Sequence, residues 1–336
     1  MRSFHHPLQM EHAPERELHN GDWVPFAECP ERFAQIREVC GGGEEAVDHG
    51  IEPILAVHDG DYIAFLESAH GEWLAAGRKG DAIGYTFPVV RRRPLSFDRI
   101  DAKLGAWSMD ASTPIAAGTW QSAYWSAQSA LSALGAVTAG ARHAFALCRP
   151  PGHHAGADYM GGYCYINNAA VVARTALAGG VAKVAVLDVD YHHGNGTQDI
   201  FYTSGEVFFA SIHADPVTDY PFYWGHADER GEGQGEGANL NLPLPRGTRW
   251  ESYEQALDTA LGAIGEWGAE LLVVSFGADT FAQDPISSFA LETSDYARMA
   301  ARIDRAGLPS VILMEGGYAV DALGENVATF LGGFGG

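Results

Sequence analysis

One segment of the chain joins a short apolar run to a group of acidic and histidine residues. Val184 to Val189 is apolar and rich in β-branched residues, which predicts a strand buried on both faces. Because side chains alternate along an extended chain, Asp188, Asp190 and His192 should project from one side of the strand end. Two carboxylates and an imidazole could form half of a site for a divalent metal. Alternatively, the two aspartates cap a helix that begins near Thr197.

A complete catalytic zinc site needs three protein ligands and one open position. Asp190, His192 and Asp279 meet that requirement. Neighbouring strands of a parallel sheet lie about 4.8 Å apart, so Asp279 can reach the same ion only if its strand lies next to Val184 to Val189. Gly277 would let the backbone approach the ion closely. The alternative is that Gly277 to Asp279 caps a following helix.

Two adjacent histidines and one tyrosine could complete an amide-hydrolysing site. His153 and His154 follow a Pro-Pro-Gly turn, and histidine suits proton transfer near neutral pH. Asp188 and Asn195 are the available partners for their second ring nitrogens, and the histidine that faces Asn195 is better suited to act as base and then as acid. Tyr318 follows two glycines and could donate its hydroxyl hydrogen to a carbonyl oxygen on which charge develops. Together these residues predict metal-assisted hydrolysis of an amide.

The elements that must position these residues follow from the apolar pattern. Apolar segments alternate with helical patterns, which predicts an α/β fold with a mostly parallel sheet and helices on both faces. Functional sites in such sheets form beyond the carboxyl ends of the strands, where the histidines, aspartates and Tyr318 lie. We expect strands at 143–148, 184–189, 207–212, 271–276 and 310–314, and helices at 28–40, 61–76, 119–138, 167–178, 253–267, 294–306 and 319–331.

Two regions lack this alternation. Residues 1–25 show no clear period and are expected to be irregular. Residues 78–118 contain scattered glycines and prolines with no sustained period of either kind, and are predicted to be an inserted loop rather than core. Its run Arg91 to Arg93 fits a solvated loop better than a binding patch. No break in composition marks a second domain, so we expect one domain over residues 1–336.

Charge and cysteine content restrict the partners. The formal charge of −22 argues against a nucleic-acid partner and favours a small cationic substrate, although acidity can also serve solubility alone. The sequence shows no signal-peptide pattern and no apolar run of membrane-spanning length, which predicts a cytoplasmic protein with no membrane partner. The four cysteines have no Cys-x-x-Cys spacing and are expected to be reduced thiols.

These residues lie in motifs that resemble the arginase/deacetylase superfamily, and within it most closely the bacterial acetylpolyamine amidohydrolases, relatives of the zinc-dependent histone deacetylases. The resemblance implies a three-layer sandwich around the sheet. The matching segments are CRPPGHHA (148–155), GGYCYINNA (161–169), LDVDYHHGNGTQDIFY (187–202), GADTF (277–281), QDPI (283–286) and MEGGY (314–318).

The resemblance also implies roles for individual residues. It implies one zinc ion per chain and a structural potassium ion. It pairs His153 with Asp188 and His154 with Asn195, and it places Tyr318 on the substrate carbonyl. The implied zinc ligands are Asp190, His192 and Asp279; the potassium site is Asp188, Asp190, His192 and Ser211; and the substrate-binding residues are Gly162, Tyr163, Tyr220, Glu17 and Asp101.

The choice of substrate depends on the inserted segment 78–118. In the polyamine enzymes a similar insertion lies at the interface of a homodimer and narrows the mouth of the tunnel, where acidic residues meet the distal ammonium group. Glu17 and Asp101 fall where such acids are expected. This sequence has Asp at 101 instead of Glu, and Ser112 where a further acid is expected, so the preferred chain length stays open.

The favoured function is deacetylation of small acetylated amines such as acetylputrescine, acetylcadaverine and acetylspermidine. A deacetylase acting on acetyl-lysine in protein tails would use the same chemistry. An arginase-like binuclear manganese hydrolase would need further carboxylates where His153 and Asn195 stand. A binding protein without catalysis would not need both the histidine pair and Tyr318.

Overall fold

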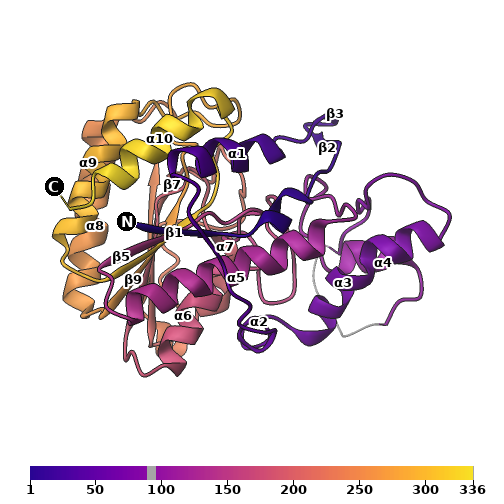
Figure 1. Cartoon of the computed structure of the whole chain (residues 1–336), viewed down its shortest axis with the longest axis horizontal. Coiled ribbons are helices and arrows are strands. Elements are labelled where there is room, and N and C mark those ends of the chain that lie inside the picture. The colour runs from indigo at the N-terminus through magenta and orange to yellow at the C-terminus, as the bar shows by residue number, and fades with distance from the viewer. Residues whose placement is uncertain (89–95, 336) are drawn as a thin grey trace.

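In the part of the chain that the structure describes, a sheet of eight parallel strands forms the centre of the protein (Figure 1). The computed structural model describes residues 1–88 and 96–335. Every pairing within this sheet is parallel. In spatial order the strands are β4 (Glu44–Glu45), β1 (Arg2–His5), β5 (His143–Ala146), β10 (Ser310–Met314), β9 (Leu271–Phe276), β6 (Val184–Asp188), β7 (Val207–Ala214) and β8 (Asn239–Leu244).

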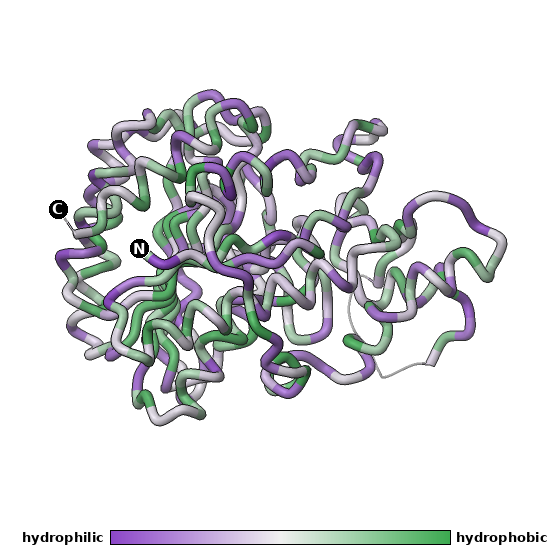
Figure 2. The backbone as a smooth tube through the Cα atoms, in the orientation of Figure 1, coloured by the Kyte–Doolittle hydropathy of each residue, from purple (hydrophilic) through white to green (hydrophobic). Residues whose placement is uncertain are grey.

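Helices cover both faces of this sheet, which confirms the expected three-layer α/β architecture. Every residue of the central strands β6, β9 and β10 is buried, as their continuous apolar sequences require. The two faces carry separate apolar clusters, and Figure 2 shows the apolar colour concentrated on the strands. On one face lie α1 (Pro30–Val39), α8 (Trp250–Trp267), α9 (Thr293–Arg305) and α10 (Val320–Gly332), and on the other α5 (Thr119–Thr138) and α6 (Asn168–Ala178).

The first 25 residues are not irregular, so that expectation was wrong. β1 enters the central sheet between β4 and β5, and β2 (Arg16–His19) pairs with β3 (Asp22–Pro25) in an antiparallel hairpin. β1 has only four residues and buries only Phe4 and His5, so its sequence carries too little apolar pattern to predict a strand. β8 was missed for a similar reason, because polar asparagines alternate with its leucines.

The inserted segment is also more ordered than expected. Within it, α4 (Ile100–Ala106) buries Ile100 and Leu104 in a third apolar cluster with residues of α3 (Gly60–Ala75). The predicted core-free loop is therefore partly a small helical layer, which lies to the right in Figure 1. The run Arg91 to Arg93 falls outside the described residues. Two further helices are short, α2 (Glu52–Leu55) and α7 (Asn195–Phe201), and two 3-10 turns span Pro7–Met10 and Gly233–Gly235.

Candidate active site

Four neighbouring strands bring the sequence motifs to one edge of the sheet. β9 pairs with β6, with Ser275 opposite Asp188, and β9 also pairs with β10. β10 in turn pairs with β5. The segments that follow these parallel strands therefore start at the same edge. The predicted adjacency of the strands that carry Asp190 and Asp279 is confirmed.

Asp190, His192 and Asp279 form a compact group of possible metal ligands. One ligand atom from each lies within 4.8 Å of the others. Nδ1 of His192 is 3.4 Å from Oδ1 of Asp190 and 3.1 Å from Oδ2 of Asp279. Both carboxylates are fully buried, and burial together with the Asp190 charge raises the pKa of Asp279 to about 7. Two buried carboxylates this close call for a compensating cation.

Two glycines leave room for these carboxylates. A Cβ atom on Gly277 would lie 2.0 Å from Oδ2 of Asp190, and one on Gly316 would lie 2.4 Å from Oδ2 of Asp279. The backbone N–H of Gly316 also donates to Oδ2 of Asp190 at 2.8 Å. Two carboxylates and an imidazole in a buried, glycine-walled space fit a zinc ion.

Helix capping does not account for these aspartates. α7 begins after Gly194, and its first turn has no side-chain cap. After Asp279 the next helix is α9, which begins only at Thr293. The alternative interpretations, in which Asp188, Asp190 or Asp279 caps a following helix, were therefore wrong.

The two adjacent histidines have different partners. Nδ1 of His153 lies 3.0 Å from Oδ2 of Asp188, and Nδ1 of His154 lies 2.6 Å from Oδ1 of Asn195. Burial disfavours the charged ring of His153, yet the Asp188 and Asp190 carboxylates raise its pKa to about 10. Burial and the neighbouring histidines hold the pKa of His154 well below its ordinary value. The two rings therefore differ in basicity, as the sequence predicted.

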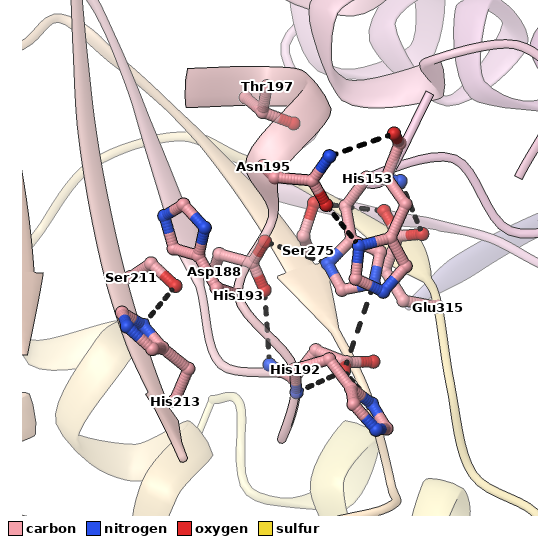
Figure 3. A network of polar contacts seen from close by, with 12 residues as sticks. His153, Asp188, His192, His193, Asn195, Thr197, Ser211, His213, Ser275 and Glu315 are labelled. Atoms are coloured by element: carbon pink, nitrogen blue, oxygen red, sulfur yellow. Dashed lines mark hydrogen bonds and ion pairs between the residues drawn. The ribbon is translucent and has the colours of Figure 1, made fainter. Parts of the chain in front are cut away.

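Glu315 supports the loop that carries these histidines, a role that sequence reasoning did not assign. Its Oε2 accepts the backbone N–H of Gly152 at 2.7 Å and that of His153 at 3.2 Å. Its Oε1 accepts from the Ser275 hydroxyl at 2.9 Å (Figure 3). Glu315, His153 and Cys164 form a second group whose possible ligand atoms lie within 4.8 Å, but these hydrogen bonds already occupy the Glu315 carboxylate.

Tyr318 is buried in a segment held from two sides by residues whose roles the sequence did not reveal. Its backbone N–H donates to Oδ2 of Asp284 at 2.6 Å. Arg32 donates to the carbonyl oxygens of Glu315 and Gly317 at 2.6 and 2.7 Å, and its guanidinium lies 4.9 Å from the Tyr318 ring centre. Burial raises the pKa of the Tyr318 phenol well above its ordinary value, so the hydroxyl stays protonated and able to donate.

The predicted substrate-binding aromatics surround these groups. The ring centres of Tyr163 and Tyr318 are 5.5 Å apart. Tyr220 meets His154 edge to face at 5.1 Å and His192 at 6.1 Å. Gly162 lies against the His154 ring, because a Cβ there would be 2.2 Å from its Cδ2 atom.

The other predicted residues, Glu17, Asp101 and Ser211, differ in how close they lie to this group. Glu17 is buried and accepts the Tyr163 hydroxyl at 2.8 Å, so it adjoins the site. Asp101 instead lies on α4, where Arg78 and Arg99 bind its carboxylate at 2.7 and 2.8 Å. Within a single chain, Asp101 does not lie beside the other site residues. Ser211 stands opposite Asp188 in the sheet, and its Oγ lies 2.8 Å from Nδ1 of His213.

Comparisons with known proteins agree with this geometry. A family model described as a histone deacetylase domain matches residues 29–334. The chain belongs to the histone deacetylase family. Members of this family are metal-dependent hydrolases, so the predicted deacetylase class is confirmed.

Several relatives in this family match almost the whole chain. "Acetylpolyamine amidohydrolase 1" of Pseudomonas aeruginosa is 49% identical over 331 residues, which cover 96% of this chain and 95% of that protein. An "Acetylpolyamine amidohydrolase" of Mycoplana ramosa is 48% identical over 327 residues, which cover 95% of each chain. These relatives confirm the subgroup that the sequence motifs resemble.

Two solved structures share the fold. The crystal structure of the acetylpolyamine aminohydrolase of Burkholderia pseudomallei superposes with a TM-score of 0.95 at 42% identity and covers 100% of this chain and 98% of that one. The HDA15 HD domain has a TM-score of 0.80 at 24% identity, covers 99% of this chain and 90% of that one, and supports the fold alone. In the described part of the chain, no helix is both long and apolar enough to cross a membrane.

Proposed function

We propose that this deacetylase removes acetyl groups from small acetylated polyamines in a zinc-dependent reaction. The observation that supports this chemistry most is the arrangement of one buried ligand group, Asp190, His192 and Asp279, beside the His153–His154 pair and Tyr318. Relatives named for acetylpolyamines match almost the whole chain and support the substrate class.

Asp190, His192 and Asp279 would hold one zinc ion per chain. A bound zinc ion acts as a Lewis acid on the amide carbonyl and lowers the pKa of water. The proposal includes a structural potassium ion near Asp188 and Ser211. Asp190 and His192 would also help to bind it. It is motivated by the register of β6 and β7, which sets Asp188 opposite Ser211.

His154 is the proposed general base and acid. Oδ1 of Asn195 accepts the hydrogen on Nδ1 of His154, which leaves the Nε2 lone pair available. The Asn195 amide nitrogen faces the His154 carbonyl oxygen and the Tyr159 hydroxyl oxygen, which fixes the direction of its oxygen. Nε2 would take a proton from the attacking water and later give it to the leaving amine. His153, bound to Asp188, would keep its charge and favour negative charge in the site.

Tyr318 would bind the carbonyl oxygen. Its phenol stays protonated, so its hydroxyl can donate a hydrogen bond as the oxygen becomes negative. Asp284 and Arg32 hold the backbone on either side of this tyrosine, so the donor would need little rearrangement during the reaction.

The methylene chain of the amine would lie between Tyr163 and Tyr220, with Glu17 behind the Tyr163 hydroxyl. A net charge of −22 would attract a cationic substrate. Asp101 does not lie beside the other site residues of its own chain, so it could meet a substrate only across an interface between two chains. This fits the proposal of a homodimer with residues 78–118 at its interface. The four free cysteines fit the proposed cytoplasmic location.

A kinetic comparison tests this proposal. The zinc-loaded enzyme should hydrolyse N-acetylputrescine with a kcat/KM at least about tenfold above that for an acetyl-lysine peptide, because a narrow tunnel disfavours bulk beyond the amine chain. The opposite order would support the acetyl-lysine deacetylase instead. Zinc content per chain, measured on the same sample, ensures that both rates belong to loaded enzyme.

A further inference from the structure

The carboxylate of Asp110 contacts Tyr220 and the turn at Gly162 and Tyr163, the two proposed walls of the substrate tunnel, and has no part in the chemistry described above. It follows a short parallel bridge in which the N–H of Met109 donates to the Met160 carbonyl oxygen at 2.9 Å. This bridge holds Asp110 next to the turn at Gly162 and Tyr163. Asp110 is half-buried and belongs to the inserted segment.

One oxygen of Asp110 joins the two proposed walls of the tunnel. Oδ2 accepts the backbone N–H of Gly162 at 2.7 Å and the hydroxyl of Tyr220 at 2.9 Å. Gly162 lies on the loop that follows the histidine pair, whereas Tyr220 lies on the loop after β7. Burial and the Asp110 charge raise the pKa of the Tyr220 phenol well above its ordinary value, so this hydroxyl stays a donor.

The other oxygen supports the same turn through Thr113. Oδ1 of Asp110 accepts from the Thr113 hydroxyl at 2.8 Å, and the Thr113 oxygen accepts the backbone N–H of Tyr163 at 3.1 Å. Gly162 and Tyr163 have φ angles of 52° and 66°, in the left-handed region that a tyrosine rarely adopts. Such a conformation persists only when its surroundings fix it, and these hydrogen bonds fix it.

The turn at Gly162 and Tyr163 packs against the reacting groups and so helps to position them. Gly162 packs against the His154 ring, and the Tyr163 ring packs against Tyr318. Tyr220 contacts His154 from the opposite wall. A displacement at Asp110 would therefore reach both walls of the tunnel and the proposed base.

Asp110 is not suited to bind the substrate ammonium group. A carboxylate offers about four acceptor positions. Here the protein occupies all four: Gly162 and Tyr220 on Oδ2, and Thr113 and the backbone N–H of Ser112, at 3.1 Å, on Oδ1.

We propose that Asp110 is a positioning residue that fixes both walls of the tunnel at once and thereby sets the bulk of amine that the enzyme accepts. This inference rests on the proposed function, because it assumes that the acetylated amine enters between Tyr163 and Tyr220. It assigns to the inserted segment a role within a single chain, independent of any dimer.

The test compares two substrates on the zinc-loaded Asp110→Asn enzyme. Asparagine keeps the shape, but its NH2 group would face two donors, so one pair of hydrogen bonds must be lost. The probes are N-acetylputrescine and its analogue with one methyl group on the carbon next to the acetylated nitrogen. We expect kcat/KM for the linear substrate to fall about tenfold to a hundredfold, because the reacting groups lose their alignment. The ratio of branched to linear kcat/KM should rise at least about fivefold.

A second variant isolates the Tyr220 contact. Tyr220→Phe removes only the hydroxyl, so it should raise the same ratio by a smaller factor and add little in the Asp110→Asn background. Asp98→Asn, which changes an exposed carboxylate of the same insertion, is the matched control and should behave as wild type. Zinc content and melting temperature are measured for every variant.

Three results would overturn the proposal: unchanged kinetics of Asp110→Asn, an equal loss on both substrates with the ratio unchanged, or a loss seen with N-acetylputrescine but not with N-butylacetamide. The last result would mean that Asp110 binds the ammonium group. If wild type prefers acetyl-lysine peptides, the proposed substrate class fails, but the linear and branched acetamides still test the role of Asp110.

Discussion

Replacement of Gly277 by alanine should greatly weaken zinc binding while the chain stays folded. The added methyl carbon would lie 2.0 Å from Oδ2 and 2.5 Å from Cγ of Asp190, and 2.7 Å from Oδ1 of Asp279. Ordinary contacts between such atoms exceed about 3 Å, so the Asp190 carboxylate must move by about 1 Å. Zinc tolerates deviations of only about 0.2 Å in its ligand distances. Displacement of a ligand should therefore weaken zinc binding at least about a hundredfold.

The assay is a zinc competition titration of metal-free protein against a chromophoric chelator, with thermal unfolding followed in parallel. Gly262→Ala in α8 is the matched control, because nothing lies within 4 Å of its Cβ position. That variant should bind zinc as wild type does and gain about 0.5–1 kcal/mol of stability from the glycine-to-alanine change in a helix. A Gly277→Ala protein that bound zinc within about threefold of wild type would refute the placement of the site between Asp190 and Asp279.

Three further variants test the surrounding residues. Tyr318→Phe should keep the zinc but lower the single-turnover rate constant about a hundredfold to a thousandfold, since the carbonyl oxygen loses a donor. A single-turnover rate constant within about threefold of wild type would exclude that role. Asp284→Ala should lower kcat about tenfold with little change in KM, because Tyr318 loses the acceptor for its backbone N–H; wild-type kcat would mean that Arg32 alone holds the segment. Burial raises the pKa of Glu17 to about 7 in the folded protein, above its ordinary value of 4.5. The contribution of this carboxyl group to stability is therefore present below pH 4.5 and lost as the pH rises through 7. Glu17→Gln should thus melt at a higher temperature than wild type at pH 8 but not at pH 4, and an equal difference at both values would contradict the titration.

The chemistry at the strand ends could be predicted from the sequence because it depends on local rules. Alternation along Val184 to Val189 and the parallel order of the sheet together place Asp190, His192 and Asp279 at one edge. The three-layer arrangement follows from strands that are apolar along their whole length and so must be covered on both faces.

The supporting residues could not be predicted, because their roles depend on contacts between distant parts of the chain. Glu315 reaches the backbone of Gly152, 163 positions away, and Arg32 reaches Gly317, 285 positions away. Nothing near these residues in the sequence indicates such partners. The sequence also cannot show when a side chain is already occupied. Asp101 was predicted to bind the substrate, but Arg78 and Arg99 bind its carboxylate.

The most direct test of the account is anomalous diffraction at the zinc absorption edge from crystals of the zinc-loaded protein. One strong peak per chain should lie about 2.0–2.2 Å from an oxygen of Asp190, Nδ1 of His192 and an oxygen of Asp279. A peak beside His153, Cys164 and Glu315 instead, or no peak from protein that deacetylates at full rate, would contradict the central claim.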